Sequence, residues 1–356
     1  MIDATQILNT LIAKKDLTKE EAQAFLDAVV AGEMTPAQIG AILTALRIKG
    51  EATSEITGLL ESMRAHMLKV DAPGAIDIVG TGGDGSGTFN ISTAAAFVAA
   101  GAGAKVAKHG NRAASSKCGS ADVLEALGVN ITLAPEQAKK VFDAAGIVFL
   151  LAPVYHAALK NVIAVRKELK IRTIFNVLGP FANPAGTRYQ LIGVPNVGIA
   201  KMMAKVASKL QYERIVIVAS KDGMDEISLS AKTDSIDVRG STTKAFTIDP
   251  QKLDFKKADK GALAGGTADD NAGIIRAILV GGKGPQRDVA VLNAAFGLYV
   301  AGIAKTPKEG IALAEKSIDT GSAKSALERL VVESNKFTAE GGSLPTGRQA
   351  PGNKTP

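Results

Sequence analysis

From residue 76 to residue 219 the sequence alternates between short β-branched runs and longer stretches with helical spacing. The runs are residues 76–79, 105–107, 147–151, 190–194 and 214–219. This alternation is typical of βαβ units, in which helices connect parallel strands of one sheet. We therefore expect an α/β fold with a mostly parallel central sheet. Residues 235–248 alternate polar and apolar side chains, which predicts a hairpin or antiparallel addition, and helices are expected at residues 269–279, 285–301, 307–317 and 323–335.

The N-terminal part of the chain has a different pattern. Up to about Met67, apolar residues recur at helical spacing, and Thr18, Thr35 and Ser54 stand where N-caps are expected. We predict a small helical domain over residues 1–70, joined by part of 165–185, and a larger α/β domain over residues 73–337. Residues 338–356 are rich in Gly, Pro, Ser and Thr and nearly free of apolar side chains, so we expect a disordered tail.

Composition narrows the class of protein. The chain has 356 residues, of which 46% are hydrophobic, enough to bury the cores of two domains. No apolar run approaches the roughly 20 residues that span a bilayer, and the N-terminus lacks the basic start of a secretory signal. We therefore expect a cytoplasmic protein with no membrane partner. Because Cys118 is the single cysteine and there are three histidines, neither a disulfide nor a zinc site is expected, and a bound metal would need oxygen ligands.

The formal net charge of +7 raises the question of nucleic acid. Lys and Arg are spread along the whole chain, Trp is absent and aromatic residues make up 4%, so few side chains could stack on bases. We expect no nucleic-acid partner and interpret the charge as suited to a small polyanionic substrate.

The strongest local signal is a glycine-rich loop, Gly80-Thr81-Gly82-Gly83-Asp84-Gly85-Ser86-Gly87-Thr88-Phe89-Asn90-Ile91-Ser92-Thr93. It lies between a predicted strand and a helix predicted over residues 94–100. Glycines let the backbone approach a ligand closely, and the N-terminus of a helix attracts anions. The loop matches neither a Walker A sequence nor a dinucleotide-binding fingerprint. It predicts a site for another phosphate ligand, and a flexible turn with an N-cap is the alternative.

A second polar cluster, residues 108–120, follows the next predicted strand and precedes a helix expected at residues 121–127. It contains three cationic side chains and three serines. The carboxyl ends of neighbouring parallel strands form the crevice where open α/β sheets bind ligands. The two clusters together therefore predict an anion site, although either one alone is also typical of a solvated loop.

Arg166 is a candidate for holding a carboxylate. On the helix predicted after residue 153 it shares one stripe with His156, Leu159 and Ile163. An arginine on a partly apolar face needs an anionic partner, and the guanidinium fork suits a carboxylate. The alternative is a structural salt bridge or a side chain that reaches solvent.

The acidic turn that contains Asp225 and Glu226 follows the last parallel strand of the predicted sheet. Adjacent carboxylates can bind Mg²⁺, which takes a few protein oxygens and keeps contacts to water and substrate phosphates. Acidic turns are common, so this signal is weak by itself. Asp269 and Asp270 are interpreted as the N-terminus of a helix.

Taken in order, these motifs resemble the anthranilate phosphoribosyltransferase family. The resemblance rests on Gly80-Thr81-Gly82-Gly83-Asp84, on residues 90–93 and 108–116, on Arg172-Thr173-Ile174-Phe175-Asn176 with Leu178-Gly179-Pro180, and on Asp225-Glu226. It continues through residues 271–279 and 293–302 and covers nearly all of the chain to about Phe337. It implies a fold like that of pyrimidine nucleoside phosphorylases, with a homodimer formed through the helical part. The implied reaction is Mg²⁺-dependent transfer of the phosphoribosyl group of phosphoribosyl pyrophosphate (PRPP) to the amine of anthranilate, in tryptophan biosynthesis.

The resemblance also implies roles for individual residues. PRPP would be bound by Gly80, Gly83, Asp84, Thr88, Asn90, Ile91, Ser92, Thr93, Lys108, His109, Gly110, Asn111, Arg112, Ala113, Ala114, Ser115, Ser116 and Ser120. Mg²⁺ would be bound by Ser92, Asp225 and Glu226, and anthranilate by Gly80, Asn111 and Arg166, with the arginine facing its carboxylate. Two positions depart from the family pattern: Cys118 replaces the usual Ser, and Phe181-Ala182 follows Gly179-Pro180 where an aliphatic residue is more usual.

We expect catalysis by position and electrostatics, because the amine of an aniline is neutral at physiological pH and already nucleophilic. No residue is assigned as an essential acid or base, and His109 is the one candidate for assistance. Two alternatives remain: a pyrimidine nucleoside phosphorylase with the same architecture, and a non-catalytic relative that binds nucleic acid.

Overall fold

A seven-stranded sheet in the order β3-β2-β1-β4-β5-β6-β7 forms the centre of the molecule. The computed structural model describes residues 3–113, 116–210 and 212–338. The strands are β1 (Ile76–Gly80), β2 (Val106–Gly110), β3 (Ile147–Leu151), β4 (Tyr189–Gly193), β5 (Arg214–Ser220), β6 (Thr233–Arg239) and β7 (Thr242–Ile248). Strands β1 to β5 pair in parallel, and β6 and β7 add to them antiparallel. The predicted parallel sheet and the antiparallel addition near residues 235–248 are confirmed.

Helices surround this sheet and precede it. They are α1 (Ala4–Ile12), α2 (Lys19–Ala31), α3 (Pro36–Lys49), α4 (Thr53–His66), α5 (Ile91–Gly101), α6 (Ser120–Ala126), α7 (Pro135–Ala145), α8 (Ala152–Tyr155), α9 (Lys160–Leu169), α10 (Phe175–Phe181), α11 (Val197–Ala207), α12 (Ala268–Leu279), α13 (Pro285–Val300), α14 (Pro307–Asp319) and α15 (Ser322–Asn335). Short 3-10 helices are η1 (Ala157–Leu159), η2 (Pro250–Leu253) and η3 (Lys260–Leu263). The four helices expected after residue 268 are confirmed. The predicted tail falls almost entirely on residues 339–356, outside the described residues.

Two of the three predicted N-caps in the helical part are confirmed. Thr18 and Thr35 accept hydrogen bonds from the backbone of the third residues of α2 and α3. The prediction for Ser54 is wrong, because α4 begins at Thr53 and the Glu55 carboxylate accepts the N–H of Ala52 at 2.7 Å. The Ser54 hydroxyl instead donates to the carbonyl of Leu17, which ties α4 to the segment before α2.

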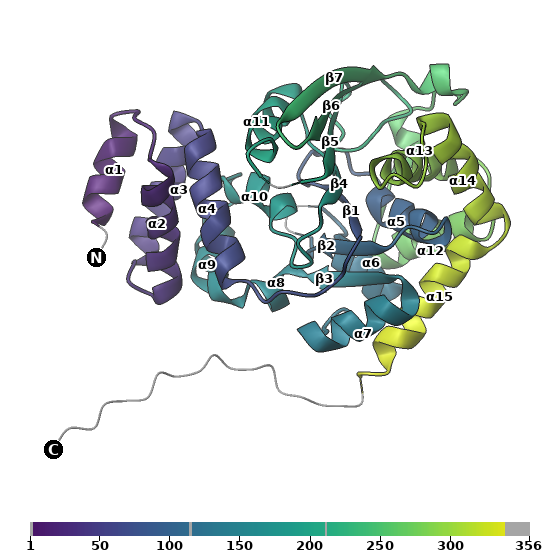
Figure 1. Cartoon of the computed structure of the whole chain (residues 1–356), viewed down its shortest axis with the longest axis horizontal. Coiled ribbons are helices and arrows are strands. Elements are labelled where there is room, and N and C mark those ends of the chain that lie inside the picture. Colours follow the sequence, from purple (N-terminus) through teal and green to yellow (C-terminus); the bar gives the residue numbers. More distant parts are fainter. Residues whose placement is uncertain (1–2, 114–115, 211, 339–356) are drawn as a thin grey trace.

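The sheet has a hydrophobic core on each face. In β5, Val216 and Val218 belong to one core, and Ile215 and Ile217 belong to the other, as the two-residue period of a strand requires. The first core takes side chains from α5 to α7 and α12 to α15, and the second takes them from α1 to α4 and α9 to α11. Figure 1 shows α1 to α4 with α9 at one end of the long axis and α5 with α12 to α15 at the other. The expected combination of a small helical part and a larger α/β part is confirmed.

One predicted helix is wrong. His156 and Arg166 were expected on a single helix, but the chain after β3 is divided into α8, η1 and α9. His156 has φ −112° and ψ 37°, outside helical geometry, and its Nε2 lies 2.9 Å from the carbonyl oxygen of Ala182. Arg166 therefore lies on α9, a separate helix of the helical part, and shares no continuous stripe with His156.

Strand order creates a crevice at one position of the sheet. β1 lies between β2 and β4, so the chain proceeds from β1 to one side through β2 and β3 and then to the other side through β4 and β5. Loops that leave the carboxyl ends of such strands diverge and leave room for a ligand. Gly80 and Gly193 pair at the ends of β1 and β4, which places this opening beside the glycine-rich loop.

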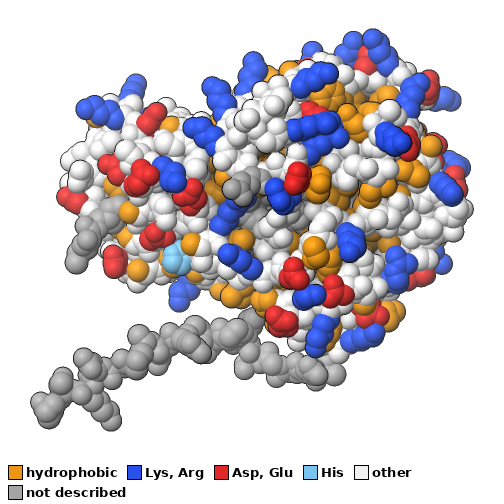
Figure 2. Space-filling view, in the orientation of Figure 1, with side chains coloured by type: hydrophobic (Ala, Val, Ile, Leu, Met, Phe, Trp, Pro, Cys, Tyr) orange, Lys and Arg blue, Asp and Glu red, His pale blue; other side chains and the backbone are white. Residues whose placement is uncertain are grey.

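Charged side chains cover much of the surface. On the face drawn in Figure 2, Lys and Arg side chains are spread over both ends of the molecule, and Asp and Glu side chains lie among them. Among the residues that the structure describes, no helix has the length and apolar character needed to cross a membrane.

Replacing Gly58 by Ala should destabilise the helical part. Gly58 lies where α4 approaches α2, and an added Cβ would collide with the carbonyl oxygen of Lys19 and contact Ala22. We expect the free energy of unfolding, measured by urea denaturation, to fall by about 2 kcal/mol. Gly273→Ala is the control, because this exposed position in α12 has no atom within 4 Å of an added Cβ and should gain about 0.5–1 kcal/mol. Equal stability of the two variants would contradict the close contact.

Candidate functional site

The two predicted anion-binding clusters leave neighbouring strands at the same edge of the sheet. β1 ends at Gly80 and continues as the glycine-rich loop, and the adjacent β2 ends at Gly110. Gly82 and Gly83 have φ values of 71° and 68°, in the left-handed region that residues with side chains rarely adopt, so glycine is strongly favoured there. Gly83 and Lys108 therefore lie on the same side of the molecule, as the sequence predicted.

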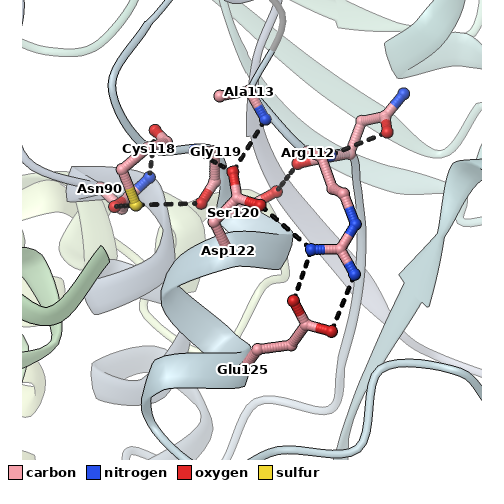
Figure 3. A network of polar contacts seen from close by, with 9 residues as sticks. Asn90, Arg112, Ala113, Cys118, Gly119, Ser120, Asp122 and Glu125 are labelled. Carbon is pink, nitrogen blue, oxygen red and sulfur yellow. Dashed lines mark hydrogen bonds and ion pairs between the residues drawn. The ribbon is translucent and has the colours of Figure 1, made fainter. Parts of the chain in front are cut away.

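Asn90 fixes the start of α5. It is the N-cap residue, but its side chain bonds outside the helix. Its Nδ2 donates to the carbonyl of Cys118 at 3.3 Å, and its Oδ1 accepts from Cys118 Sγ at 3.3 Å (Figure 3). The same Oδ1 also accepts from Asn271 Nδ2 at 2.9 Å. The thiol of Cys118 thus makes a hydrogen bond that a serine hydroxyl could also make. Asn271 belongs to α12, 181 residues from Asn90, so no local sequence pattern identified it as part of the site.

Lys108 lies in β2 rather than in the loop after it, which corrects the predicted end of this strand. Its ammonium is buried and donates to the carbonyl of Ile78 at 2.7 Å and to the hydroxyl of Ser92 at 3.2 Å. Burial lowers the pKa of Lys108, while the carboxylates of Asp77, Glu226 and Asp225 favour its charged form. The side chain joins β1, β2 and α5 beneath the glycine-rich loop.

Arg112 is engaged by acidic residues of α6. Its guanidinium bonds both carboxylate oxygens of Glu125, at 2.5 and 2.8 Å, and one oxygen of Asp122 at 3.2 Å (Figure 3). The other oxygen of Asp122 accepts the N–H groups of Ala113 and Gly119, at 2.9 and 2.8 Å. An anion that binds Arg112 would have to compete with these carboxylates. No sequence pattern indicated this competition.

Two serines of the second cluster, which were predicted to contact PRPP, make hydrogen bonds within the loop itself. The Ser120 hydroxyl donates to the carbonyl of Asn111 at 3.3 Å, and the Ser116 hydroxyl donates to that of Cys118 at 3.4 Å. Ala114 and Ser115 lie outside the described residues.

In the glycine-rich cluster, Ile91 is fully buried, so only its backbone could contact a ligand. The Thr88 hydroxyl lies 3.2 Å from that of Ser86. The buried hydroxyl of Thr93, in the first turn of α5, has no hydrogen-bond partner within the described part of the chain.

Three carboxylates converge where β1 and β4 end. Oxygen atoms of Asp84, Asp225 and Glu226 all lie within 4.8 Å of one another. Asp225 Oδ2 accepts the N–H of Gly82 at 2.6 Å, and Asp84 Oδ2 accepts the N–H of Asp225 at 3.3 Å. Burial and then the Asp84 carboxylate raise the pKa of Asp225 to about 7, and burial and then Asp225 raise that of Glu226 well above its usual value. From the sequence, Asp84 was assigned to PRPP binding. Its position beside Asp225 and Glu226 was not predicted.

This cluster fits a divalent cation. Its donors are hard oxygens of the kind Mg²⁺ prefers, and their crowding is costly without a positive charge between them. Glu226 Oε2 is buried and has no hydrogen-bond partner among the described residues. Ser92, the third predicted metal ligand, lines one small cavity together with Asp225 and Glu226.

Arg166 has no carboxylate partner among its contacts in the described residues. Its Nη2 lies 3.4 Å from Asn176 Oδ1, and its guanidinium lies 5.5 Å from the ring centre of Phe175. Burial lowers its pKa, and its buried Nε atom makes no hydrogen bond to the part of the chain that the structure describes. The alternative interpretation, a structural salt bridge, is therefore not found among the described residues, and the side chain retains donors for a ligand carboxylate.

Arg172 is a second arginine near the site, and the sequence pattern had assigned it no role. It follows α9, and its Nη1 donates to the carbonyls of Gly82 and Gly83, at 3.4 and 3.3 Å. The helical part thereby contacts the glycine-rich loop directly.

His109 is poorly suited to act as a base. It is buried on β2 with its ring 5.3 Å from that of His156. Burial, and then His156, lower the pKa of His109 to about 3, and burial lowers that of His156 to about 4. Both rings are therefore neutral at physiological pH and hold protons weakly.

Comparison with known proteins points to one family. Residues 5–67 match the model described as "Glycosyl transferase family, helical bundle domain", and residues 72–324 match "Glycosyl transferase family, a/b domain". The anthranilate phosphoribosyltransferase of Thermomicrobium roseum is 50% identical over 335 residues, covering 92% of this chain and 96% of the relative. That of Herpetosiphon aurantiacus is 50% identical over 329 residues, covering 92% and 97%.

Solved structures agree with these relatives. A crystal structure of anthranilate phosphoribosyltransferase from Thermus thermophilus has a TM-score of 0.85 and 40% identity, covering 92% of this chain and 99% of that chain. The enzyme from Saccharomyces cerevisiae in complex with PRPP and Mg has a TM-score of 0.85 and 29% identity, covering 94% and 98%.

Replacing Asp225 by Asn should stabilise the protein when divalent cations are removed with EDTA. Because the folded pKa of about 7 exceeds the usual 3.8, ionising this carboxyl lowers stability increasingly as the pH rises from about 4 to 7. The shift of about three pKa units, at about 1.4 kcal/mol per unit, sets an upper limit of about 4 kcal/mol on the gain at pH 8, and the gain should be smaller at pH 5. The Asn side-chain oxygen can still accept the N–H of Gly82.

Urea denaturation at both pH values measures this gain. Asp71→Asn is the control, because that carboxylate is 71% exposed and its replacement should change stability equally little at either pH. A D225N variant that is no more stable than the native protein at pH 8 would show that the three carboxylates are not in repulsive contact.

Proposed function

The chain belongs to the anthranilate phosphoribosyltransferase family, and on that premise we propose that it transfers the 5-phosphoribosyl group of PRPP to the amine of anthranilate. The products are N-(5-phosphoribosyl)anthranilate and pyrophosphate, and the reaction belongs to tryptophan biosynthesis. The observation that carries this proposal is the meeting of the glycine-rich loop, Lys108 and three carboxylates at one edge of the sheet. These groups suit a substrate that is both highly anionic and bound to a metal.

Mg²⁺ is the metal that we propose, held by Asp84, Asp225 and Glu226 with Ser92 nearby. The structure of the yeast relative in complex with PRPP and Mg supports this choice. When bound, the ion would supply positive charge to the diphosphate that leaves. The protein supplies the remaining stabilisation through backbone N–H groups of the glycine-rich loop and the N-terminus of α5, both positioned before the reaction begins.

PRPP would occupy the crevice between the loop after β1 and the segment after β2. We assign to it Gly80, Gly83, Asp84 and Thr88 of the glycine-rich loop, residues 90–93, residues 108–116 and Ser120, as the family resemblance implies. Lys108 is buried and already bonded to Ser92. We therefore propose that it holds Ser92 in position and contributes positive charge to the PRPP site. Arg112 would bind the diphosphate after its ion pair with Glu125 is broken.

Anthranilate would bind against the helical part, with its carboxylate at Arg166 and further contacts to Asn111 and Gly80. The unpaired donors of Arg166 and the neighbouring Phe175 ring support this placement. The substrate amine is neutral and nucleophilic, so binding needs only to hold it against C1 of the ribose. The lowered pKa of His109 supports a mechanism without an essential base.

We also propose a cytoplasmic homodimer that associates through the helical part. The exposed side chains of Ile12 on α1 and Ile48 on α3 support an apolar contact there. A pyrimidine nucleoside phosphorylase is the rival enzyme, and a nucleic-acid-binding relative is the rival of another class; the names of the relatives favour the transferase.

Purified protein mixed with PRPP, Mg²⁺ and anthranilate should lower the fluorescence of anthranilate with time. The double variant Asp225→Asn, Glu226→Gln should reduce kcat/KM by about 100-fold or more, because charge stabilisation of the leaving diphosphate is lost. Asp71→Asn should leave the rate unchanged. Full Mg²⁺-dependent turnover by the double variant, or phosphorolysis of thymidine or uridine by the native protein, would contradict the proposal.

Arg166→Lys should affect one substrate selectively. A lysine cannot form the paired hydrogen bonds of a guanidinium with a carboxylate, so we expect the KM for anthranilate to rise by about 10-fold or more. The KM for PRPP should change by less than about two-fold on the same argument. Steady-state kinetics with each substrate varied in turn makes the comparison, and equal increases in both KM values would argue against contact with anthranilate.

A further inference from the structure

A buried asparagine of α13 holds the turn that carries Asp225 and Glu226. Asn293 is 2% exposed, its Oδ1 accepts the N–H of Ile227 at 3.0 Å, and its Nδ2 donates to the Ile227 carbonyl at 2.9 Å. One amide side chain thus satisfies both backbone groups of the residue that directly follows Glu226. Nδ2 also donates to the carbonyl of Val289, one turn earlier in α13, at 2.9 Å.

Asn293 lies in a buried segment of α13. Its neighbours in sequence, Leu292 and Ala294, are fully buried in the core of the α/β part. An amide in such a position is unfavourable unless its hydrogen bonds are made, and here the three bonds satisfy it. Asn293 also lines the small cavity that Ser92, Asp225 and Glu226 share, so this polar group lies next to the proposed metal site.

On the N-terminal side of Glu226, the turn is held by contacts to Asp225. A Cβ added at Gly193 would collide with the backbone carbonyl of Asp225, and one added at Gly80 would meet the Asp225 carboxylate. The ends of β1 and β4 therefore press directly against Asp225. Glu226 lies between a residue fixed by these strands and Ile227, which is fixed by Asn293.

The contacts that hold the turn act against electrostatic repulsion between carboxylates. Asp84, Asp225 and Glu226 have oxygens within 4.8 Å of one another, and in the ionised forms that bind a cation, like charges so close would separate if the turn could move. We propose that Asn293 is a positioning residue, which holds Glu226 at the place where it binds the divalent cation together with Asp84 and Asp225. The inference rests on the proposed function, because it requires Mg²⁺ to bind at these carboxylates.

The test compares Asn293→Ala with a matched loss of hydrogen bonds elsewhere. Asn130→Ala is the control: its Nδ2 donates to the Ser334 carbonyl at 3.3 Å, far along the chain from the acidic turn. Thermal unfolding of each protein is followed while Mg²⁺ alone is titrated after removal of metal with EDTA. Both variants should unfold at a lower temperature than the native protein without metal. The Mg²⁺ concentration that gives half of the Tm increase should rise on the order of 10–100-fold in N293A and stay unchanged in N130A.

Kinetics give a second measurement. In N293A the apparent KM for PRPP should rise at low Mg²⁺ and recover when Mg²⁺ is raised, with kcat largely retained, which a general loss of folding would not produce. If N293A does not fold, the same titration is applied to Asn293→Ser, whose hydroxyl is too short to bond both groups of Ile227.

The outcomes separate this inference from the proposed function. A native-like Mg²⁺ midpoint in N293A, or in N293S where that variant is used, overturns the positioning role while leaving the metal site intact. A native protein whose Tm does not respond to Mg²⁺, and whose turnover with PRPP and anthranilate needs no metal, overturns the proposed metal site and this inference with it.

Discussion

The mutual repulsion of Asp84, Asp225 and Glu226 is the constraint on which the rest of the site depends. Three carboxylates within 4.8 Å are unfavourable by themselves, so the fold must hold them and a cation must balance them. The protein supplies one cation itself, the buried Lys108, which is bonded to Ile78 and Ser92 rather than to the acids. The remaining negative charge makes the crevice suitable for a metal that arrives with an anionic substrate.

Much of the fold could be predicted from the sequence, because local patterns determine it. Runs such as 147–151 and 214–219 alternate with helical stretches, and the strands they predict are present as β3 and β5. Thr18 and Thr35 cap helices as expected, since capping depends on residues only three positions apart. The glycine-rich loop was also identified correctly as a loop at the end of a strand, because glycine readily adopts the positive φ values that Gly82 and Gly83 have there.

The contacts that complete the site depend on residues far apart in the sequence, and these were missed. Asp84 joins Asp225 across 141 residues, which the pairing of β1 with β4 and of β4 with β5 brings about. The engagement of Arg112 by Glu125 depends on how α6 packs, and the break at His156 depends on a contact with Ala182. No local pattern encodes such contacts. An acidic residue in a glycine-rich loop, followed much later by an acidic pair after a parallel strand, was the one available signal for the cluster.

We propose that Asp84, Asp225 and Glu226 bind one divalent cation beside PRPP. Crystals grown with PRPP and Mn²⁺ in place of Mg²⁺ test this directly, because anomalous diffraction at the manganese edge locates the ion. We predict a peak coordinated by oxygens of these three side chains, next to the diphosphate. Manganese bound by the diphosphate alone, with the three carboxylates turned away from it, would contradict the claim.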